Sequence, residues 1–304
     1  MKPEVIVIGA GFAGSVIAER FAHVTGKRVL VLEKRAHVGG NMYDYIDENG
    51  VRRHEYGPHI FHTHSREVVD YLSQFTDWYP YQHRVLGHIN GVVAPIPFNL
   101  TTIERSFPKE KAERLKTLLI NEYGMEKKVP ILQLRANANP EINELAEYIY
   151  EHVFKYYTMK QWGQTPEEID PAVTGRVPVH ISYDDRYFQD TYQMMPAHGF
   201  TGIFENMLKN EKIEVRLKTD AKSCLKVDLE NKQILFEGEV FQGPVIFTGA
   251  IDDLLELSVR TSCRTVRWNS IFRAIRIPTR KRRLSTIRPR PSKTRLPASR
   301  NTNS

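Results

Sequence analysis

Near the amino terminus, glycines and one acidic residue have the spacing of a dinucleotide-binding site. The segment Gly9–Gly14 satisfies the pattern G-x-G-x-x-G directly after an apolar run. Gly9 permits a tight turn, Gly11 lets the backbone approach a pyrophosphate, and Gly14 lets a following helix pack on the sheet. The first amides of this helix can bind phosphates. Glu33 follows Gly14 by 19 residues, where a carboxylate can accept both hydroxyls of an adenosine ribose. The alternative is a glycine turn in an unrelated α/β protein.

The residues around this motif predict a βαβ unit. Val5–Ile8 is a continuous run of β-branched residues, which is typical of a strand buried on both faces of a parallel sheet. We expect a helix over residues 13–22 and a second strand over residues 28–32. A second glycine pair, Gly39 and Gly40, precedes Asn41. This pair favours FAD over NAD as the dinucleotide, although it can also be a plain loop.

The remaining sequence predicts two further kinds of structure. Residues 101–162 are rich in Glu, Lys, Leu and Ala at helical spacing, with a turn at 137–140, which indicates an inserted helical domain. Strand patterns return at 213–217, 233–236 and 245–247. We therefore predict an α/β fold: a Rossmann-like FAD-binding domain with a parallel sheet, an inserted helical domain, and a mixed or antiparallel sheet domain. The expected boundaries are 1–85 for the FAD-binding part, 86–175 for the mainly helical domain, 176–253 for the sheet domain and the return to the FAD-binding domain, and 254–304 for a disordered basic tail.

Composition and charge exclude several classes of protein. The chain has 304 residues, of which 41% are hydrophobic, so it can bury a substantial core. No apolar run approaches roughly 18 residues, and we expect a cytoplasmic protein without a membrane span. Cys224 and Cys263 are too few for a disulfide framework. The net charge of +7 comes from the end of the chain: residues 257–304 hold 14 of the 43 Lys and Arg and none of the 36 Asp and Glu, which leaves 29 basic against 36 acidic residues before them.

Further motifs occur in the order found in one enzyme family. They are YGPHIFHT at 56–63, FKYYTMKQW at 154–162, Arg176 in GRVP and Tyr187 in DRYF. Together with the glycine motifs they resemble UDP-galactopyranose mutases, from Val5 to about residue 252. The resemblance implies that the first histidine of the 56–63 segment lies against the flavin and that the 154–162 segment lines a uridine pocket. It also implies that Arg176 and Tyr187 meet the diphosphate.

The chemistry of these residues agrees with such roles without requiring them. An arginine presents a planar fork of donors for phosphate oxygens, and aromatic rings can stack on a pyrimidine. Taken singly, the aromatic cluster can be core and Arg176 a solvated ion pair. The histidines from His59 to His64 can be a loop cluster or metal ligands, but no carboxylate or cysteine pattern completes a site, so we expect no metal. The site residues that the resemblance implies are catalytic His59 and Arg176; substrate-binding Phe154, Tyr157, Thr158, Trp162, Arg176 and Tyr187; and cofactor-binding Gly9, Gly11, Phe12, Ala13, Gly14, Glu33, Lys34, Gly40, Asn41, His59, Ile60 and Gly249.

The resemblance also implies a reaction, the interconversion of UDP-galactopyranose and UDP-galactofuranose without net redox change. In the family, N5 of reduced FAD attacks the anomeric carbon, UDP leaves, and the flavin-bound sugar opens and recloses as a furanose. The protein holds the diphosphate, orients the anomeric carbon and excludes water. An electron donor such as NADPH and a homodimer of the full-length protein are implied as partners. The alternatives are an amine oxidase-like FAD oxidoreductase, which would share the glycine motifs but not the 154–162 segment, and a catalytically inactive nucleotide-binding fragment.

The basic end of the chain has the properties of a translation in the wrong frame. By composition it would be a disordered basic arm. However, codons permitted for residues 261–304, read from the third base of the first codon, can encode a string that begins KLPYRSVEF and contains TRITEYK. Both elements resemble the continuation of the mutase family. We therefore predict a frame change between about Leu254 and Thr261, and in that case the basic tail requires no nucleic-acid partner.

Overall fold

The structure is a computed structural model that describes residues 2–155, 178–228, 230–250 and 253–254. All of these residues belong to one compact unit. Of the predicted tail, 254–304, every residue except Leu254 lies outside the described residues, so the expectation of disorder there stays a prediction.

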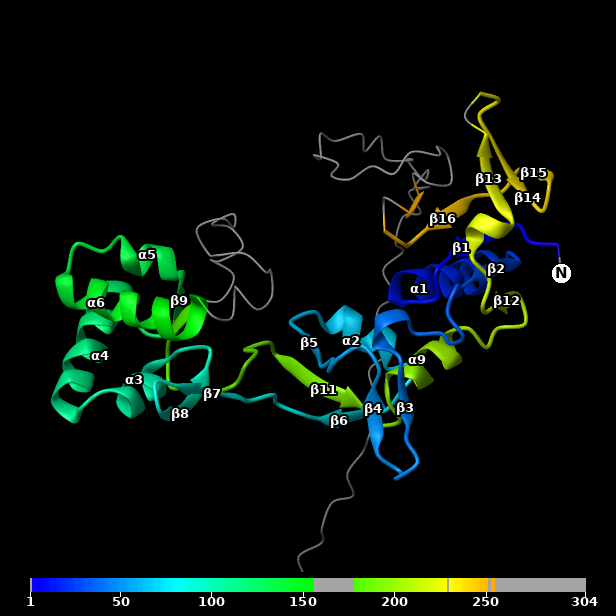
Figure 1. Ribbon diagram of the computed structural model, residues 1–304. Helices are drawn as coiled ribbons and strands as arrows, with labels where there is room; N and C mark the ends of the chain where they lie inside the picture. The colour runs from blue at the N-terminus through cyan, green and yellow to red at the C-terminus, as the bar shows by residue number, and fades with distance from the viewer. Residues whose placement is uncertain (1, 156–177, 229, 251–252, 255–304) are drawn as a thin grey trace, which may run out of the picture. The chain divides into compact units, whose positions relative to one another are not determined.

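A four-stranded parallel sheet holds both ends of the described chain together. Its strands are β1 (Val5–Ile8), β2 (Val29–Leu32), β12 (Ile213–Arg216) and β16 (Val245–Phe247), in the order β12-β2-β1-β16. All three pairings are parallel. In Figure 1 the blue β1 and β2 lie beside β12 and the orange β16. The carboxyl ends of all four strands therefore meet at one edge of the sheet, which is where open α/β sheets bind their ligands.

Apolar side chains cover both faces of this sheet, because successive residues of a strand point to opposite sides. On one face, Val5 and Val7 pack with helices α1 (Phe12–Arg20) and α9 (Phe200–Met207). On the other face, Ile6 packs with the antiparallel sheet β13-β14-β15. The predicted doubly buried strand and the Rossmann-like unit are confirmed. The predicted first helix ends earlier than expected, since the chain continues as a π-helical turn, η1 (Phe21–Thr25).

Short strands and helices form the rest of this region. They are η2 (Gly40–Met42), β3 (Asp44–Ile46) paired with β4 (Arg52–His54), α2 (Arg66–Leu72), η4 (Ala221–Ser223), the sheet β5 (Phe61–Thr63), β11 (Tyr192–Pro196) and β6 (Trp78–Pro80), and the sheet β13 (Leu225–Asp228), β14 (Gln233–Phe236) and β15 (Glu239–Phe241). These last two sheets are antiparallel, as the predicted fold class requires.

The inserted helical part has its own hydrophobic core. Its elements are the hairpin β7 (Val85–Ile89) and β8 (Val92–Ile96), followed by α3 (Leu100–Ser106), α4 (Lys109–Tyr123), β9 (Lys127–Val129), α5 (Ile131–Arg135), α6 (Pro140–Ile149), η3 (Tyr150–Phe154) and β10 (Val179–Ile181). The predicted turn lies between α5 and α6, where the Asn139 side chain accepts the Glu141 amide and caps α6. Val179 and Ile181 belong to this core, which therefore continues past the expected boundary at residue 175.

Asp44 anchors helix α9 from far away in the sequence. Its carboxylate is 2% exposed, and it accepts the backbone amides of Phe200 and Thr201 at 2.8 and 2.9 Å. These are orphan donors of the first turn, which an acidic side chain satisfies favourably. Helix α9 in turn carries Phe204, whose ring lies 4.6 Å from that of Phe12 at the start of α1. Asp44 thereby supports the helix that follows the glycine motif.

Candidate functional site

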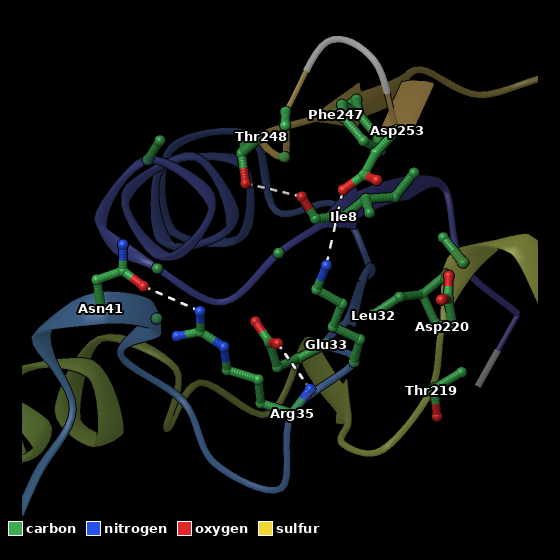
Figure 2. A pocket seen from close by; sticks show the side chains of 18 of the residues that line it. Ile8, Leu32, Glu33, Arg35, Asn41, Thr219, Asp220, Phe247, Thr248 and Asp253 are labelled. Atoms are coloured by element: carbon green, nitrogen blue, oxygen red, sulfur yellow. Dashed lines mark hydrogen bonds and ion pairs between the residues drawn. The ribbon is translucent and has the colours of Figure 1, made fainter. Parts of the chain in front are cut away.

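A cavity of about 550 Å³ lies at the carboxyl edge of the parallel sheet. Figure 2 shows side chains from the ends of β1, β2 and β16 and from the loops after β2, β12 and β16 around it. The residues that line it are Ile8, Gly9, Gly11, Phe12, Ala13, Leu32, Glu33, Lys34, Arg35, Gly39, Gly40, Asn41, Met42, Thr219, Asp220, Ala221, Lys222, Phe247, Thr248, Gly249, Ala250 and Asp253. Nine of the twelve predicted cofactor residues are among them.

Two of the first three glycines are required by the backbone of this loop. Gly9 has a φ of +101°, and a Cβ there would lie 2.4 Å from the Thr248 hydroxyl. A Cβ on Gly14 would lie 1.9 Å from the Gly9 carbonyl oxygen and 3.3 Å from the Val7 side chain. The predicted reasons for these two glycines, a tight turn and close packing of helix on sheet, are confirmed. Gly14 does not line the cavity, because it lies buried beneath the loop.

The second glycine pair packs directly against the first loop. Gly39 donates its amide to the Ala10 carbonyl at 2.8 Å. Gly40 has a φ of +56°, and a Cβ there would lie 3.0 Å from the Gly11 Cα. Both glycines therefore allow two backbone loops to touch. This contact is a physical reason for glycine at both positions, while the predicted role of the pair in FAD binding stays a prediction.

Glu33 ties the end of β2 to the glycine loop. Its side chain is buried, with one carboxylate oxygen accepting the Ala10 amide and the other accepting the Arg35 amide, both at 2.8 Å. A carboxylate offers about four acceptor positions, so each oxygen keeps capacity for one more donor. The carboxylate is held in place at the cavity wall with acceptor capacity suited to two ribose hydroxyls.

The start of helix α1 offers amides to an anion. Its N-cap is Gly11, no side chain caps the helix, and its first turn carries no acidic residue. The first amides of a helix have no partner within the helix, and the helix dipole makes this end positive. Because Phe12 and Ala13 line the cavity, the positive end of the helix faces it, and phosphate binding by their amides stays a prediction.

Three cationic side chains also line the cavity. Arg35 donates from Nη2 to the Asn41 side chain at 2.9 Å and lies over the Tyr56 ring, 4.3 Å from its centroid. Its Nη1 is buried and has no hydrogen-bond partner in the described part of the chain. Lys34 and Lys222 both approach Asp253, at 3.6 and 3.7 Å. Arg35 thus places a cationic side chain in the cavity wall, with one buried nitrogen that has no hydrogen-bond partner in the described part of the chain.

The cavity wall from Thr219 to Lys222 was missed by reasoning from the sequence. This loop follows β12, which pairs with the outer side of β2. Asp220 accepts the Lys222 amide and so shapes the 3-10 turn that faces the cavity. The predicted strand over residues 213–217 could have indicated this wall, because the loop that follows a strand neighbouring β2 lies beside Glu33. What the sequence lacked was the strand order.

His59 and Ile60 do not line this cavity. His59 is half-buried in the loop before β5, where its Nδ1 lies 2.9 Å from the Gly57 carbonyl and its ring 6.4 Å from that of His54. Burial lowers the pKa of His54. The predicted contact of His59 and Ile60 with a flavin stays a prediction. Among the described residues, no group of three or more His, Cys, Asp or Glu side chains could hold a metal ion.

The predicted substrate residues are described only in part. Tyr157, Thr158, Trp162 and Arg176 lie outside the described residues.

Phe154 and Tyr187 have different surroundings. The Phe154 ring is 4% exposed and belongs to the helical core, so it packs against apolar neighbours and presents no open face for stacking. Tyr187 is half-buried, and its amide donates to the His83 carbonyl at 2.8 Å. Tyr187 lies in the chain between β10 and β11, and its predicted contact with a diphosphate stays a prediction.

This fold and cavity define a protein of the Rossmann-like class that binds nucleotide cofactors. Residues 7–75 match the model of an NAD(P)-binding Rossmann-like domain, and residues 152–273 match the model of UDP-galactopyranose mutase. The chain is similar to UDP-galactopyranose mutases over this region. The second match extends past the window 254–261, so it does not place the predicted frame change.

Individual proteins are similar to most of this chain but are only partly covered by it. The chain is 35% identical over 256 residues to UDP-galactopyranose mutase of Mycoplasma pneumoniae, covering 83% of this chain and 63% of that protein. It is 34% identical over 250 residues to dTDP-fucopyranose mutase of Escherichia coli, covering 82% and 63%. A crystal structure of reduced UDP-galactopyranose mutase shares the fold with a TM-score of 0.57 at 20% identity, covering 85% of this chain and 57% of that one. The chain thus spans under two thirds of the length of these relatives. None of the helices in the described ranges is long and apolar enough to cross a membrane.

Proposed function

We propose that the cavity binds FAD and that the chain carries the flavin-binding and nucleotide-binding parts of a mutase that interconverts UDP-galactopyranose and UDP-galactofuranose. The observation that carries this proposal is the convergence of Glu33, the uncapped start of α1 and the Arg35 side chain on one cavity of about 550 Å³. A volume of this size is within the ordinary range of cofactor sites.

The residues present fit FAD. Glu33 would accept the ribose hydroxyls, the amides of Phe12 and Ala13 would meet the pyrophosphate, and the Arg35 guanidinium would attract the phosphates. Gly9 and Gly40 let the loops at this edge pack closely, since a Cβ at these positions would lie 2.4 Å from the Thr248 hydroxyl and 3.0 Å from the Gly11 Cα. When bound and reduced, FAD would supply a nucleophilic nitrogen for ring contraction. The residues of this chain would anchor it and orient it toward the sugar.

The substrate is proposed from the family and from the motifs at 154–162, Arg176 and Tyr187. A dTDP-fucopyranose mutase is about as similar to the chain as a UDP-galactopyranose mutase, so dTDP-fucopyranose is the second candidate. We propose NADPH as reductant, a homodimer for the full-length protein and the cytoplasm as its location.

A titration of the purified 304-residue chain with FAD tests the cofactor. Glu33→Gln should weaken FAD binding by about tenfold or more, because charge-assisted hydrogen bonds to the ribose are replaced by weaker ones. Flavin fluorescence quenching measures the affinity, and the exposed Glu48→Gln is the matched control, which should leave it unchanged. Tighter binding of NAD than of FAD would refute the cofactor assignment.

Repair of the reading frame tests the activity. We propose that the frame changes between residues 254 and 261, which resequencing across codons 250–265 would show directly. The 304-residue chain should neither retain FAD through purification nor isomerise the sugar, and mutase activity of this chain with dithionite would refute that expectation.

The repaired protein should convert UDP-galactopyranose, and dTDP-fucopyranose run in parallel identifies the preferred sugar. Arg176→Ala in the repaired protein should abolish UDP binding, so an unchanged affinity by calorimetry would contradict the role of Arg176.

A further inference from the structure

Three polar side chains enclose the turn that carries Tyr187 and Phe188. Gln193 of β11 is 9% exposed, and its Nε2 donates to the carbonyls of Phe188 and Asp190, both at 3.0 Å. A buried side-chain amide that donates twice to one turn fixes the carbonyl directions of that turn. Gln193 therefore sets the backbone from Phe188 to Asp190 against strand β11.

A histidine from the neighbouring strand closes the other side of the turn. His62 of β5 lies opposite Gln193 in the β5-β11 register, and its Nδ1 lies 3.0 Å from the Asp190 carboxylate. Because a carboxylate only accepts, Nδ1 carries the proton. The His62 ring stacks on Phe188 with 3.6 Å between centroids and an interplanar angle of 14°. Asp190 thereby holds the ring that covers Phe188.

Phe188 passes this restraint on to Tyr187. The two rings meet edge to face, 4.9 Å apart at 89°, which is a favoured aromatic geometry. Tyr187 is the residue expected to meet a nucleotide diphosphate, and His59 and Ile60, shortly before His62 in the chain, are expected to meet the flavin. The same side chains therefore join the two surfaces that the reaction must bring together.

We infer that His62, Asp190 and Gln193 form a positioning unit that holds Phe188 and Tyr187 in place for the sugar nucleotide. This inference rests on the proposed function for the identity of the ligand, while the restraint on the turn stands on the contacts alone. None of the three residues needs to touch the ligand.

Hydrogen–deuterium exchange of the 304-residue chain tests the restraint without any ligand. Gln193→Leu keeps the volume and removes both donated bonds, so exchange in peptides covering residues 186–191 should become about tenfold faster or more, the effect expected from losing one to two net hydrogen bonds. His88→Gln, at an exposed position in β7, is the control and should leave these peptides unchanged. Unchanged exchange in Gln193→Leu overturns the inference.

Binding of UDP, measured by calorimetry on the same chain, tests the link to the ligand. His62→Ala removes the stack and should weaken UDP binding about tenfold, whereas His62→Phe keeps a ring on Phe188 and should restore it to within about threefold of wild type, a difference that aromatic stacking supports. FAD affinity should stay the same in both variants. Faster exchange in Gln193→Leu together with an unaltered UDP affinity in His62→Ala overturns the inference. If the wild-type chain binds no UDP, the proposed function fails, and the exchange result still decides whether the unit holds the turn.

Discussion

The carboxylate of Asp44 gives the sharpest prediction about stability. Asp44→Ala removes the acceptor for the amides of Phe200 and Thr201, which the structure places at 2.8 and 2.9 Å in a site that is 2% exposed. Each buried donor left without a partner costs about 1 to 3 kcal/mol, so the two together should lower the free energy of unfolding by about 3 kcal/mol. Asp44→Asn keeps one acceptor oxygen and should cost roughly half as much.

Urea unfolding followed by circular dichroism measures this difference. With a slope of about 3 kcal/mol/M, the midpoint of Asp44→Ala should fall by about 1 M. The matched control is Asp70→Ala in α2, because the Asp70 side chain is 64% exposed and pairs with Arg66 at 3.4 Å on the helix surface; such pairs are worth under about 1 kcal/mol. If Asp44→Ala and Asp70→Ala have the same midpoint, the carboxylate does not anchor α9 and the reasoning is wrong.

Two further predictions concern the glycine loop and pH. Gly14→Ala should lower the free energy of unfolding by about 1 to 3 kcal/mol, because its Cβ would lie 1.9 Å from a backbone oxygen. The control is Gly202→Ala, which has nothing within 4 Å of its Cβ and should be neutral or stabilising by up to about 1 kcal/mol. Equal losses of stability in both variants would contradict the packing argument. Burial lowers the pKa of the His180 imidazole in the folded protein. As the pH falls, the imidazole is therefore protonated in the unfolded chain before it is protonated in the folded one. The free energy of unfolding should fall as the pH drops below the ordinary histidine pKa of about 6.5 toward the lowered pKa of the folded state. Unfolding midpoints at pH 7.5 and 5.5 should differ less in His180→Gln than in wild type, and an undiminished difference would show that another group is responsible.

The parts of the fold that depend on neighbouring residues could be predicted from the sequence. The strand Val5–Ile8, the helix after the glycines and the second strand depend on apolar patterning within about 30 residues, and the structure has all three. The turn at 137–140 was visible because Asn139 and Pro140 are typical helix-start residues. Local chemistry was sufficient for these elements.

Contacts between distant residues could not be predicted in the same way. Nothing near Asp44 indicates that it caps a helix that begins at Phe200, and nothing near Thr219 indicates a cavity wall. Phe154 shows the converse limit: an aromatic residue in a family motif looks the same in sequence whether it faces a ligand or a core, and in the structure it is buried. Strand order and burial depend on the whole chain, so they needed the structure.

The position of β16 constrains how the predicted frame change would affect the cofactor site. β16 pairs with β1, and Thr248 donates from its hydroxyl to the Ile8 carbonyl at 2.7 Å, as Figure 2 shows. Thr248 and Gly249 thus complete the cavity wall beside Gly9, and both precede the window 254–261. A frame change in that window would leave this wall intact and remove only contacts made by later residues. FAD binding that can be measured by titration but is too weak to survive purification is therefore the behaviour that the structure and the frame change predict together.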